Sequence, residues 1–569
     1  MNEQKLYEKW LENALDDKDL HEELVAVNGK KDEIFERFYR ELDFGTAGLR
    51  GVIGAGTNRM NIYTIRRATQ GLAMMLCERY TAPSVAIAYD SRIKSDLFAR
   101  EAARVLAGNG IAVHIYPELM PVPALSFATR RLKCEAGIMV TASHNPAKYN
   151  GYKVYGADGC QLGTEESARV LEFANTVEPF EGVKLADYDE AVKQGLIKLI
   201  PEEIVQSLLD HIEAQAVRRG ICESADLKVV YTPLNGAGNR CVRSVLSRIG
   251  VKNVVVVPEQ EQPDGTFATC PFPNPEIREA LQKGLELCEK ENPSILLATD
   301  PDCDRVGIAV NHNGGYTLLS GNEVGVLLTH YIASSRAELG TLPKNPIVVK
   351  TIVTTSMVDS MGADLGVEVV NILTGFKYIG EQIALLEAKG EQDRFILGFE
   401  ESYGYLAGTY VRDKDAVVAS MLICEMTAYY KSRGMTLVDA LEALYTKYGV
   451  HLNIQSNFYC EGASGMQKMA DIMDELRLNP PKDIGGMAVI SVSDYETSKK
   501  TTDGVDEAIN LPKSNVLTYG VAGDTQVVIR PSGTEPKIKA YYMVKAPTKA
   551  QADDISNNLV AAVTKMLGF

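Results

Sequence analysis

The sequence predicts three consecutive, similar α/β domains with mixed sheets, followed by a smaller C-terminal α+β domain. Short apolar runs alternate with helical segments of roughly 10–15 residues, an order typical of βαβ units on largely parallel sheets. The chain has 569 residues, too many for one core at roughly 150 residues per domain. After about residue 450, short strands and two helices replace this alternation. The repeat therefore lies in the order of elements rather than in residue identity.

Four regions follow from this pattern. We expect an N-terminal arm with the first domain at 1–204, and further domains at 205–315, 316–450 and 451–569. The arm, residues 3–42, carries apolar residues spaced among charges as in amphipathic helices. In the first domain we expect helices near 62–80, 94–108 and 122–132, and strands at Ser84–Tyr89, Ile111–Tyr116, Ile138–Val140 and Tyr152–Tyr155. The last strand lies between two turn dipeptides, and this reversal would bring Lys153 back towards Ser143.

The later regions are predicted in the same way. Residues 185–220 form a helical, charged bridge to the second domain. We expect helices near 238–249, 274–290, 464–476 and 548–566. We expect strands at Leu227–Tyr231, Val251–Val257, Ser294–Thr299, Val306–Val310, Ile347–Thr351, Val367–Leu373, Phe395–Gly398 and Thr525–Ile529.

Composition narrows the class of function. A net charge of −16 argues against a nucleic-acid or anionic-membrane surface, so an anionic substrate would need local Arg and Lys clusters. The ten cysteines are scattered without the spacing of a disulfide framework or a zinc site. No apolar run approaches the roughly 20 residues of a membrane span. These features predict a cytoplasmic protein.

Two loops after predicted strands carry reactive groups. Thr141-Ala142-Ser143-His144-Asn145-Pro146 follows Ile138–Val140, and Pro146 keeps Asn145 out of the helical region, so Ser143 should lie on a rigid turn. In Asp300-Pro301-Asp302-Cys303-Asp304-Arg305, alternate residues of an extended chain would place three carboxylates on one side. Such oxygen ligands favour Mg²⁺ or Ca²⁺, and the loop lacks the EF-hand pattern. By themselves, both loops could also be ordinary solvated turns.

Three further loops have binding chemistry. Phe44-Gly45-Thr46-Ala47-Gly48-Leu49-Arg50-Gly51 sets one cation, Arg50, among glycines. The carboxylates and hydroxyl of Gly398-Phe399-Glu400-Glu401-Ser402-Tyr403-Gly404-Tyr405 suit sugar hydroxyls, although a plain surface loop has the same composition. Arg530-Pro531-Ser532-Gly533-Thr534-Glu535-Pro536 could hold a phosphate and does not match a nucleotide P-loop.

Together the loops predict phosphoryl transfer, which needs mainly positioning and charge neutralisation. A Ser–His–Asp hydrolase fits poorly, because Ser143 lacks the GxSxG turn. We also expect His144 to point away from Ser143, as adjacent side chains do on extended chain.

From about Phe44 to the C-terminus the chain resembles the α-D-phosphohexomutase superfamily, whose four motifs TASHNP, DPDCDR, FEES and RPSGTEP occur here in order. It looks most like the branch of bacterial phosphoglucomutases and phosphopentomutase-like enzymes. This resemblance implies four domains around a central cleft. It makes Ser143 the phosphoserine, Lys153 the general acid/base, and Arg50 and His144 active-site residues. The implied Mg²⁺ ligands, one ion per chain, are Ser143, Asp300, Asp302 and Asp304. The implied substrate-binding residues are Arg305, Lys377, Glu400, Ser402, Arg530, Ser532, Gly533 and Thr534.

The implied reaction interconverts glucose 1-phosphate and glucose 6-phosphate through glucose 1,6-bisphosphate, in a monomer or homodimer. Tyr403-Gly404 replaces the Gly-His of the phosphomannomutase and phosphoglucosamine mutase branches, which favours glucose first and pentose second. Phosphopentomutase, phosphomannomutase or hexose-bisphosphate synthase activity are the alternatives. From another class, a catalytically silent sugar-phosphate-binding regulator is disfavoured by the intact Ser143, Asp triad and Lys153.

Overall fold

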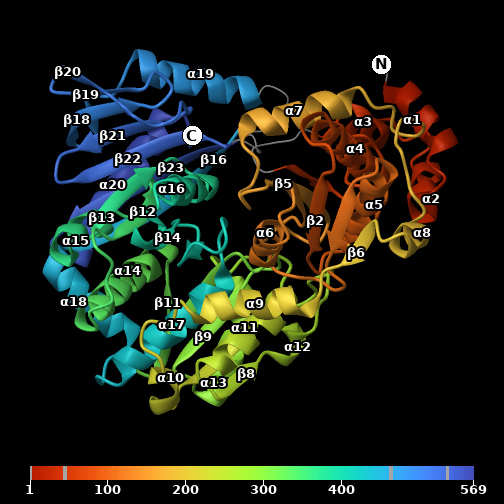
Figure 1. Cartoon of the computed structure of the whole chain (residues 1–569). Coiled ribbons are helices and arrows are strands. Elements are labelled where there is room, and N and C mark those ends of the chain that lie inside the picture. The colour runs from red at the N-terminus through yellow and green to blue at the C-terminus, as the bar shows by residue number, and fades with distance from the viewer. Residues whose placement is uncertain (1–2, 43–47, 461–464, 533–536) are drawn as a thin grey trace. The chain divides into compact units, whose positions relative to one another are not determined.

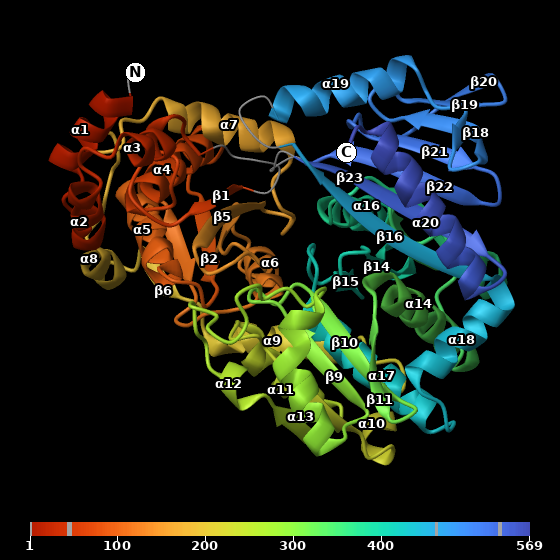
Figure 2. The ribbon, with the colours of Figure 1, turned by 180° about the vertical axis from the view of Figure 1, so that it is seen from behind.

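A computed structural model describes residues 3–42, 48–460, 465–532 and 537–569. The chain divides into two compact units, and its elements are labelled in Figure 1 and seen from behind in Figure 2. The first unit contains the chain up to Leu319 with residues 380–392 and 403–433. The second contains residues 320–379, 393–402 and 434–569. The architecture is the predicted one: mixed α/β sheets in sequence, followed by a C-terminal domain with an antiparallel sheet. The four domain boundaries stay a prediction.

The N-terminal arm is helical, as predicted. It consists of α1 (Glu3–Asn13), α2 (Lys18–Ala26) and α3 (Lys31–Phe38). Trp10 is almost completely buried and packs edge-on against Phe38, Tyr63 and Phe180. Trp10, Phe38 and Tyr63 belong to the hydrophobic core of the first sheet, and Phe180 packs against it. The arm is therefore part of that core.

The first sheet has the strand order β1-β5-β4-β2-β3-β6. Its strands are β1 (Leu49–Val52), β2 (Ser84–Tyr89), β3 (Ala112–Ile115), β4 (Ala136–Val140), β5 (Tyr149–Gly156) and β6 (Ile197–Leu199). Its helices are α4 (Ile62–Arg79), α5 (Ser95–Gly108), α6 (Val122–Arg131), α7 (Thr164–Asn175), α8 (Tyr188–Lys193) and α9 (Glu202–Glu213). The central strand β4 is buried along its whole length, and α5 and α6 pack on it from opposite sides (Figures 1 and 2).

The second sheet has the order β11-β10-β9-β7-β8. Its strands are β7 (Lys228–Thr232), β8 (Asn253–Val256), β9 (Ile295–Thr299), β10 (Val306–His312) and β11 (Gly315–Leu319). The helices are α10 (Ile221–Ser224), α11 (Gly238–Arg248), α12 (Pro258–Glu261), α13 (Gln282–Glu291) and the 3₁₀ turn η1 (Arg278–Leu281). The first unit also holds β15 (Tyr405–Leu406) and α17 (Ala416–Lys431), which is buried along almost its whole length.

In the second unit, β12 (Ile347–Thr351) lies parallel between β13 (Glu368–Ile372) and β14 (Phe395–Phe399). The helices of the two later domains are α14 (Gly321–Glu338), α15 (Met357–Leu365), α18 (Leu437–Tyr448), α19 (Gly465–Leu478) and α20 (Lys549–Met566). Helix α16 (Lys377–Ala388) and the turn η2 (Gln392–Arg394) run across the division between the units. The last sheet contains β16 (Val450–Tyr459), β17 (Asp483–Ile484), β18 (Met487–Asp494), β19 (Lys499–Thr502), β20 (Val505–Ala508), β21 (Leu517–Val521), β22 (Thr525–Pro531) and β23 (Lys537–Ala546).

Two local predictions are wrong. The bridge at 185–220 is not wholly helical, because Ile197–Leu199 forms β6 and pairs in parallel with β3. This pairing satisfies the backbone hydrogen-bonding groups of the segment. The segment is short and charged, so its sequence does not show the apolar pattern of a strand. The helix expected near 274–290 begins later: η1 precedes α13, which starts at Gln282. Within the described ranges, no helix is both long and apolar enough to cross a membrane.

Candidate active site

Ser143 lies on a turn immediately after β4, as predicted. Its φ of 52° is in the left-handed region, and its backbone N–H donates to Thr141 Oγ1 at 2.8 Å. The side-chain Oγ donates to Asp300 Oδ2 at 3.1 Å. It also lies 3.1 Å from His144 Nδ1, so the expectation that these side chains point apart is wrong. The reason is the left-handed turn, which replaces the extended chain that we assumed.

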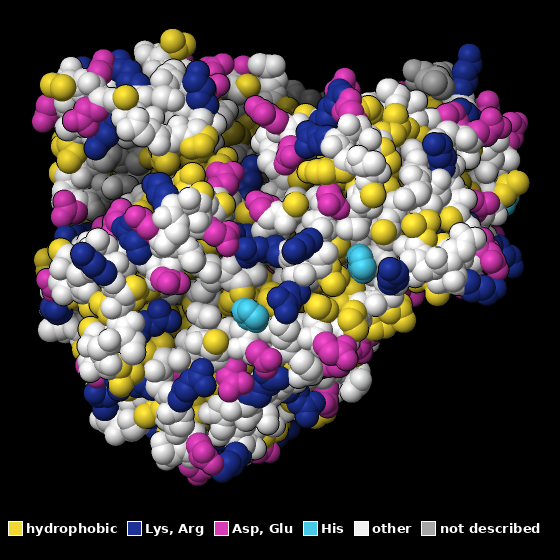
Figure 3. All heavy atoms as spheres, in the orientation of Figure 1, with side chains coloured by type: hydrophobic (Ala, Val, Ile, Leu, Met, Phe, Trp, Pro, Cys, Tyr) yellow, Lys and Arg dark blue, Asp and Glu magenta, His cyan; other side chains and the backbone are white. Residues whose placement is uncertain are grey.

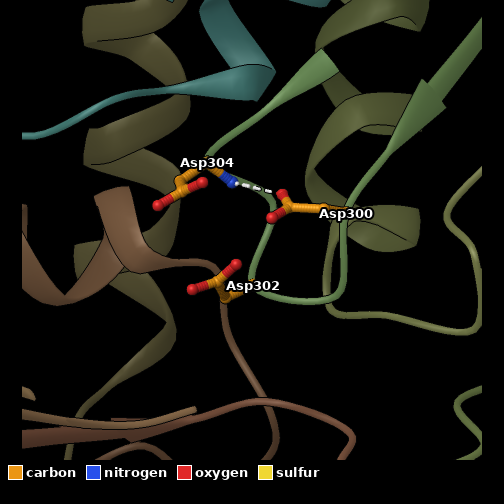
Figure 4. A group of neighbouring side chains, drawn as sticks. All are labelled: Asp300, Asp302 and Asp304. Atoms are coloured by element: carbon orange, nitrogen blue, oxygen red, sulfur yellow. Dashed lines mark hydrogen bonds between the residues drawn. The ribbon is translucent and has the colours of Figure 1, made fainter. Parts of the chain in front are cut away.

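Asp300, Asp302 and Asp304 bring their carboxylates together, with ligand atoms within 4.8 Å of one another (Figure 4). They converge through a turn, with Cys303 at a φ of 52°, and not through the extended chain that we expected. The oxygen Oδ1 of Asp300 accepts from the backbone N–H groups of Asp304 and Arg305, at 3.1 and 2.9 Å. All three side chains are almost completely buried.

This triad suits a cation. Burial, then the neighbouring carboxylates, raises the pKa of Asp300 well above its usual range. Burial and Asp302 raise the pKa of Asp304. Among the described residues, Oδ1 of Asp302 and Oδ1 of Asp304 are buried and accept no hydrogen bond. Buried oxygens without donors are costly unless a cation binds them, so the site could hold a hard divalent metal.

Two lysines flank the triad. Lys153, on β5, lies 3.0 Å from Asp302 Oδ2, so the β5 reversal brings it to the Ser143 site as predicted. Burial opposes ionisation of Asp302, but the charge of Lys153 prevails and lowers its pKa below the usual range. Lys414, which the sequence analysis missed, lies 3.2 Å from Asp304 Oδ2. Its position in the charged run Asp413-Lys414-Asp415, between apolar segments, was the available signal.

Arg50, Arg305 and His144 belong to the same unit. Arg50, on β1, donates to Asn145 Oδ1 at 3.1 Å. Arg305 forms an ion pair with Glu276, a second residue that the sequence analysis missed. Burial lowers the pKa of His144 well below its usual value, and the charges of Arg305 and Arg50 add to this shift. The imidazole is therefore neutral at neutral pH and lies next to the Ser143 hydroxyl.

The Ser143 turn is held by a buried arginine, Arg92, which the sequence analysis also missed. Its guanidinium donates to the carbonyls of Ser143, Asn145, Pro146 and Tyr149. Asp90 Oδ2 lies 3.4 Å from Arg92 and accepts from Thr141 Oγ1 at 2.7 Å. Asp90-Ser91-Arg92 follows the end of β2, so a polar loop at the end of a parallel strand was the signal.

The remaining predicted residues lie in the second unit. Glu400 accepts from the backbone N–H of Gly375 at 2.9 Å, and Arg530 Nη1 donates to Thr374 Oγ1 at 2.8 Å. Lys377 follows as the first residue of α16, with its Nζ 5.0 Å from the centre of the Tyr378 ring. The segment 374–377 therefore contains Lys377 and contacts both Glu400 and Arg530. Ser402 and Ser532 are both partly buried. In the sequence they follow Glu400 and Arg530, respectively, by two residues.

Part of the prediction falls outside the described residues. Gly533 and Thr534 of the predicted phosphate loop lie there, as do residues 44–47 of the glycine-rich loop. The roles of the site residues stay predictions, because the geometry gives their positions and not their activity.

Comparison with known proteins identifies the family of this chain. Descriptions of the phosphoglucomutase/phosphomannomutase alpha/beta/alpha domains I, II and III match residues 41–180, 206–315 and 320–448. A phosphoglucomutase of Staphylococcus aureus is 36% identical over 563 residues, 98% of each chain. The chain belongs to the phosphoglucomutase/phosphomannomutase family. A phosphoglucomutase of Staphylococcus haemolyticus is 37% identical over 525 residues, 91% of this chain and 93% of its own.

Solved structures share the fold of this family member. The Paramecium phosphoglucomutase parafusin, in an open form, matches with a TM-score of 0.66 at 16% identity, over 93% of this chain and 95% of its own. A phosphoglucomutase/phosphomannomutase family protein of Burkholderia thailandensis also gives 0.66, at 17% identity, over 92% and 97% of the two chains.

Proposed function

We propose that this family member is a phosphoglucomutase that interconverts glucose 1-phosphate and glucose 6-phosphate. The observation that carries the proposal is the 3.1 Å contact between Ser143 Oγ and Asp300 of the buried triad. This contact supports the proposal, because a hydroxyl beside a candidate metal site could supply the nucleophile and the charge neutralisation that phosphoryl transfer needs. The near full-length likeness to phosphoglucomutases supports the choice of sugar.

The proposed cycle has two transfers. First, the bond from phosphorus to Ser143 Oγ breaks as the sugar's free hydroxyl bonds to phosphorus, giving glucose 1,6-bisphosphate. Lys153, in its uncharged form, takes the proton of that hydroxyl, and solvent protonates the departing Ser143 oxygen. After the bisphosphate reorients, Ser143 Oγ loses its proton to solvent as it bonds to the other phosphorus, and Lys153 gives its proton to the leaving sugar oxygen. The protein then releases the isomeric monophosphate.

The remaining residues bind and orient. Asp300, Asp302 and Asp304, with the phosphate on Ser143, would hold one Mg²⁺, which offsets a phosphoserine charge of about −1.5 to −2. Arg50, His144 and Arg305 contact the reacting phosphate. Lys377, Glu400 and Ser402 bind the sugar, whereas Arg530, Ser532, Gly533 and Thr534 hold the other phosphate. We further propose sugar phosphates as the substrates, no nucleic-acid or membrane partner, a monomer or homodimer, and a cytoplasmic location.

Two measurements test the proposal. Intact mass after incubation with glucose 1,6-bisphosphate should show one added phosphate, which Ser143→Ala lacks. This variant should fold and lose at least about 10³-fold in turnover, as expected for an activated nucleophile. The kcat/KM for glucose 1-phosphate should exceed that for ribose 1-phosphate and mannose 1-phosphate. An active enzyme with unmodified Ser143, or a preference for ribose 1-phosphate, would contradict the mechanism or the substrate respectively.

A further inference from the structure

A cavity lies in the first unit, away from Ser143. Its volume is about 410 Å³, and it is lined by α6, the end of α9 and the segment after β15. The lining includes Phe127, Arg130, Arg131, His211, Gln215 and Tyr410. A volume of this size is typical of small-molecule sites.

The cavity carries excess positive charge. Arg130 lies 3.2 Å from Glu387, and buried Arg412 also pairs with Glu387, so two guanidinium groups share one carboxylate. Arg131 is exposed and makes no ion pair in the part of the chain that the structure describes. In the view of Figure 3, basic side chains and a histidine gather over the region of α6 and α9. In a chain of net charge −16, such a cluster favours an anion.

Three aromatic rings also line the cavity: Phe127 from α6, His211 from α9 and Tyr410 from the segment after β15. The His211 ring lies 5.2 Å from the Phe127 ring and 6.2 Å from the Tyr410 ring, between centroids. His211 Nδ1 lies 2.7 Å from the carbonyl of Ser207, which makes it the donor nitrogen and leaves Nε2 for a ligand. Gln215 adds an amide at the same edge. A ligand with a flat ring and an anionic group would contact both the aromatic rings and the arginines.

Two segments that line the cavity are also connected to the loop of Asp300, Asp302 and Asp304. At the N-terminus of α6, the backbone N–H of Val122 donates to the carbonyl of Asp302 at 2.9 Å. Arg131 stands at the other end of this helix, about 14 Å away at 1.5 Å per residue. In the segment after β15, Tyr410 lies four residues before Lys414, which contacts Asp304. A ligand in the cavity would therefore contact two segments, each of which contacts a different residue of the triad.

We propose that this cavity binds a small organic phosphate with an aromatic ring, and that its occupation is coupled to the Asp300–Asp304 loop. The phosphate contacts Arg131 and Arg130, and the ring lies against Phe127, His211 and Tyr410. This site is separate from the proposed substrate site and does not depend on the proposed reaction.

Calorimetric titration of the whole chain with phenyl phosphate tests the site. The wild type should bind at millimolar or lower concentration, and Arg131→Gln should weaken binding about fivefold, the size of one exposed charge contact. Lys133→Gln is the matched control, since Lys133 is also exposed, two residues away, and does not line the cavity. It should bind as the wild type does. Hydrogen exchange of residues 300–306 should slow on binding in the wild type.

A third variant separates this site from the substrate site. Arg530→Ala should leave phenyl phosphate binding unchanged. The proposal is overturned if no binding is measured, or if binding is equal in the wild type and Arg131→Gln. It is also overturned if binding is lost in Arg530→Ala alone, because the probe then occupies the proposed substrate site. An unchanged exchange rate at 300–306 would refute the coupling.

Discussion

Ser143 and Cys303 both have left-handed backbone conformations, at φ 52° in each case, although neither is a glycine. Each such residue costs about 1–2 kcal/mol, so surrounding contacts must hold it. For Ser143 the contacts come from Arg92 and Asp90. The strain brings Ser143 Oγ to both His144 and Asp300, which an unstrained extended chain would not do.

Arg92→Lys should disturb the Ser143 turn without removing the charge. A lysine ammonium is a compact donor and cannot reach the four carbonyls that the planar guanidinium contacts. We expect a loss of about 3–6 kcal/mol in the free energy of unfolding, from two charge-assisted hydrogen bonds. The kcat should fall at least about tenfold with little change in KM, because the turn positions the nucleophile.

Steady-state kinetics and thermal unfolding measure both effects. Arg100→Lys is the control, because Arg100 stacks on the Tyr188 ring at 4.3 Å and should tolerate the change. A variant with a higher KM and an unchanged kcat would assign Arg92 to substrate binding instead.

Asp302→Asn should remove the response to metal. The amide keeps the size of the side chain but loses the charge of one of three ligands, and the Lys153 ion pair is lost with it. In the wild type, Mg²⁺ should raise the thermal midpoint by binding the folded state. The variant should show no rise and very low activity, whereas the exposed control Asp158→Asn should behave as the wild type. An equal Mg²⁺ response in both proteins would exclude Asp302 as a ligand.

The buried carboxylate of Asp415 caps the N-terminus of helix α17. Its ionisation makes the free energy of unfolding depend on pH. Asp415 accepts from the backbone N–H groups of Val417 and Val418 and from Tyr410 Oη at 2.6 Å. Burial nevertheless raises the pKa of Asp415 to about 6, above its ordinary value of 3.8. The folded state therefore holds the proton more tightly than the unfolded state, and stability is lost as pH rises from about 4 to about 6.

Asp415→Asn should remove this pH dependence while an amide oxygen still caps the helix. Between pH 4.5 and 7.5 the wild type should lose about 2 kcal/mol relative to the variant. Urea midpoints of the two proteins at both pH values give the comparison. A difference between them that stays constant with pH would show that Asp415 does not titrate in this range.

The packing of α14 on β14 determines where the Glu400 loop begins. A Cβ at Gly325 would overlap the ring of Phe399, the residue that precedes Glu400. Gly325→Ala should cost about 1–3 kcal/mol through overpacking, and displacement of Glu400 should raise KM. Gly315→Ala is the control, since nothing lies within 4 Å of its Cβ position. Unchanged stability and KM in Gly325→Ala would show that the ring moves without consequence.

At the scale of the whole molecule, the proposed chemistry and the proposed substrate grip belong to different compact units. Ser143, Lys153 and the Asp triad lie in the first unit, whereas Glu400 and Arg530 lie in the second. Groups in the second unit would contact the substrate equally before and during transfer. Interactions of that kind affect KM more than kcat.

Arg530→Ala should therefore raise KM about ten- to 150-fold, the value of a charge-assisted phosphate contact. The kcat should fall less, and more bisphosphate should escape because its anchor is weakened. Steady-state kinetics with released bisphosphate measured alongside would show this. Thr374→Val removes only the side-chain partner of Arg530, and should have a smaller effect. A large fall in kcat with unchanged KM would place Arg530 in the chemistry.

The sequence by itself determined the order of strands and helices and the loops that bear the site. Strands such as Ser84–Tyr89 and Ile347–Thr351 were predicted to the residue, because a buried parallel strand is a continuous apolar run between turn residues. The family motifs identified the loops that carry the site. Each of these loops of polar, Gly and Pro residues follows an apolar run, which explains its position at the end of a strand. The short β6 was missed, because only its pairing with β3 makes it a strand.

Tertiary structure alone decided which side chains meet. Asp300 comes to Ser143 across 157 residues, and Lys414 reaches Asp304 from a segment without a motif. Arg92 supports the Ser143 turn through backbone carbonyls; the polar loop after β2 indicates its position in the sequence but not these partners. Local pattern records burial and turn propensity, whereas these contacts depend on how distant strand ends are brought together by the folded core.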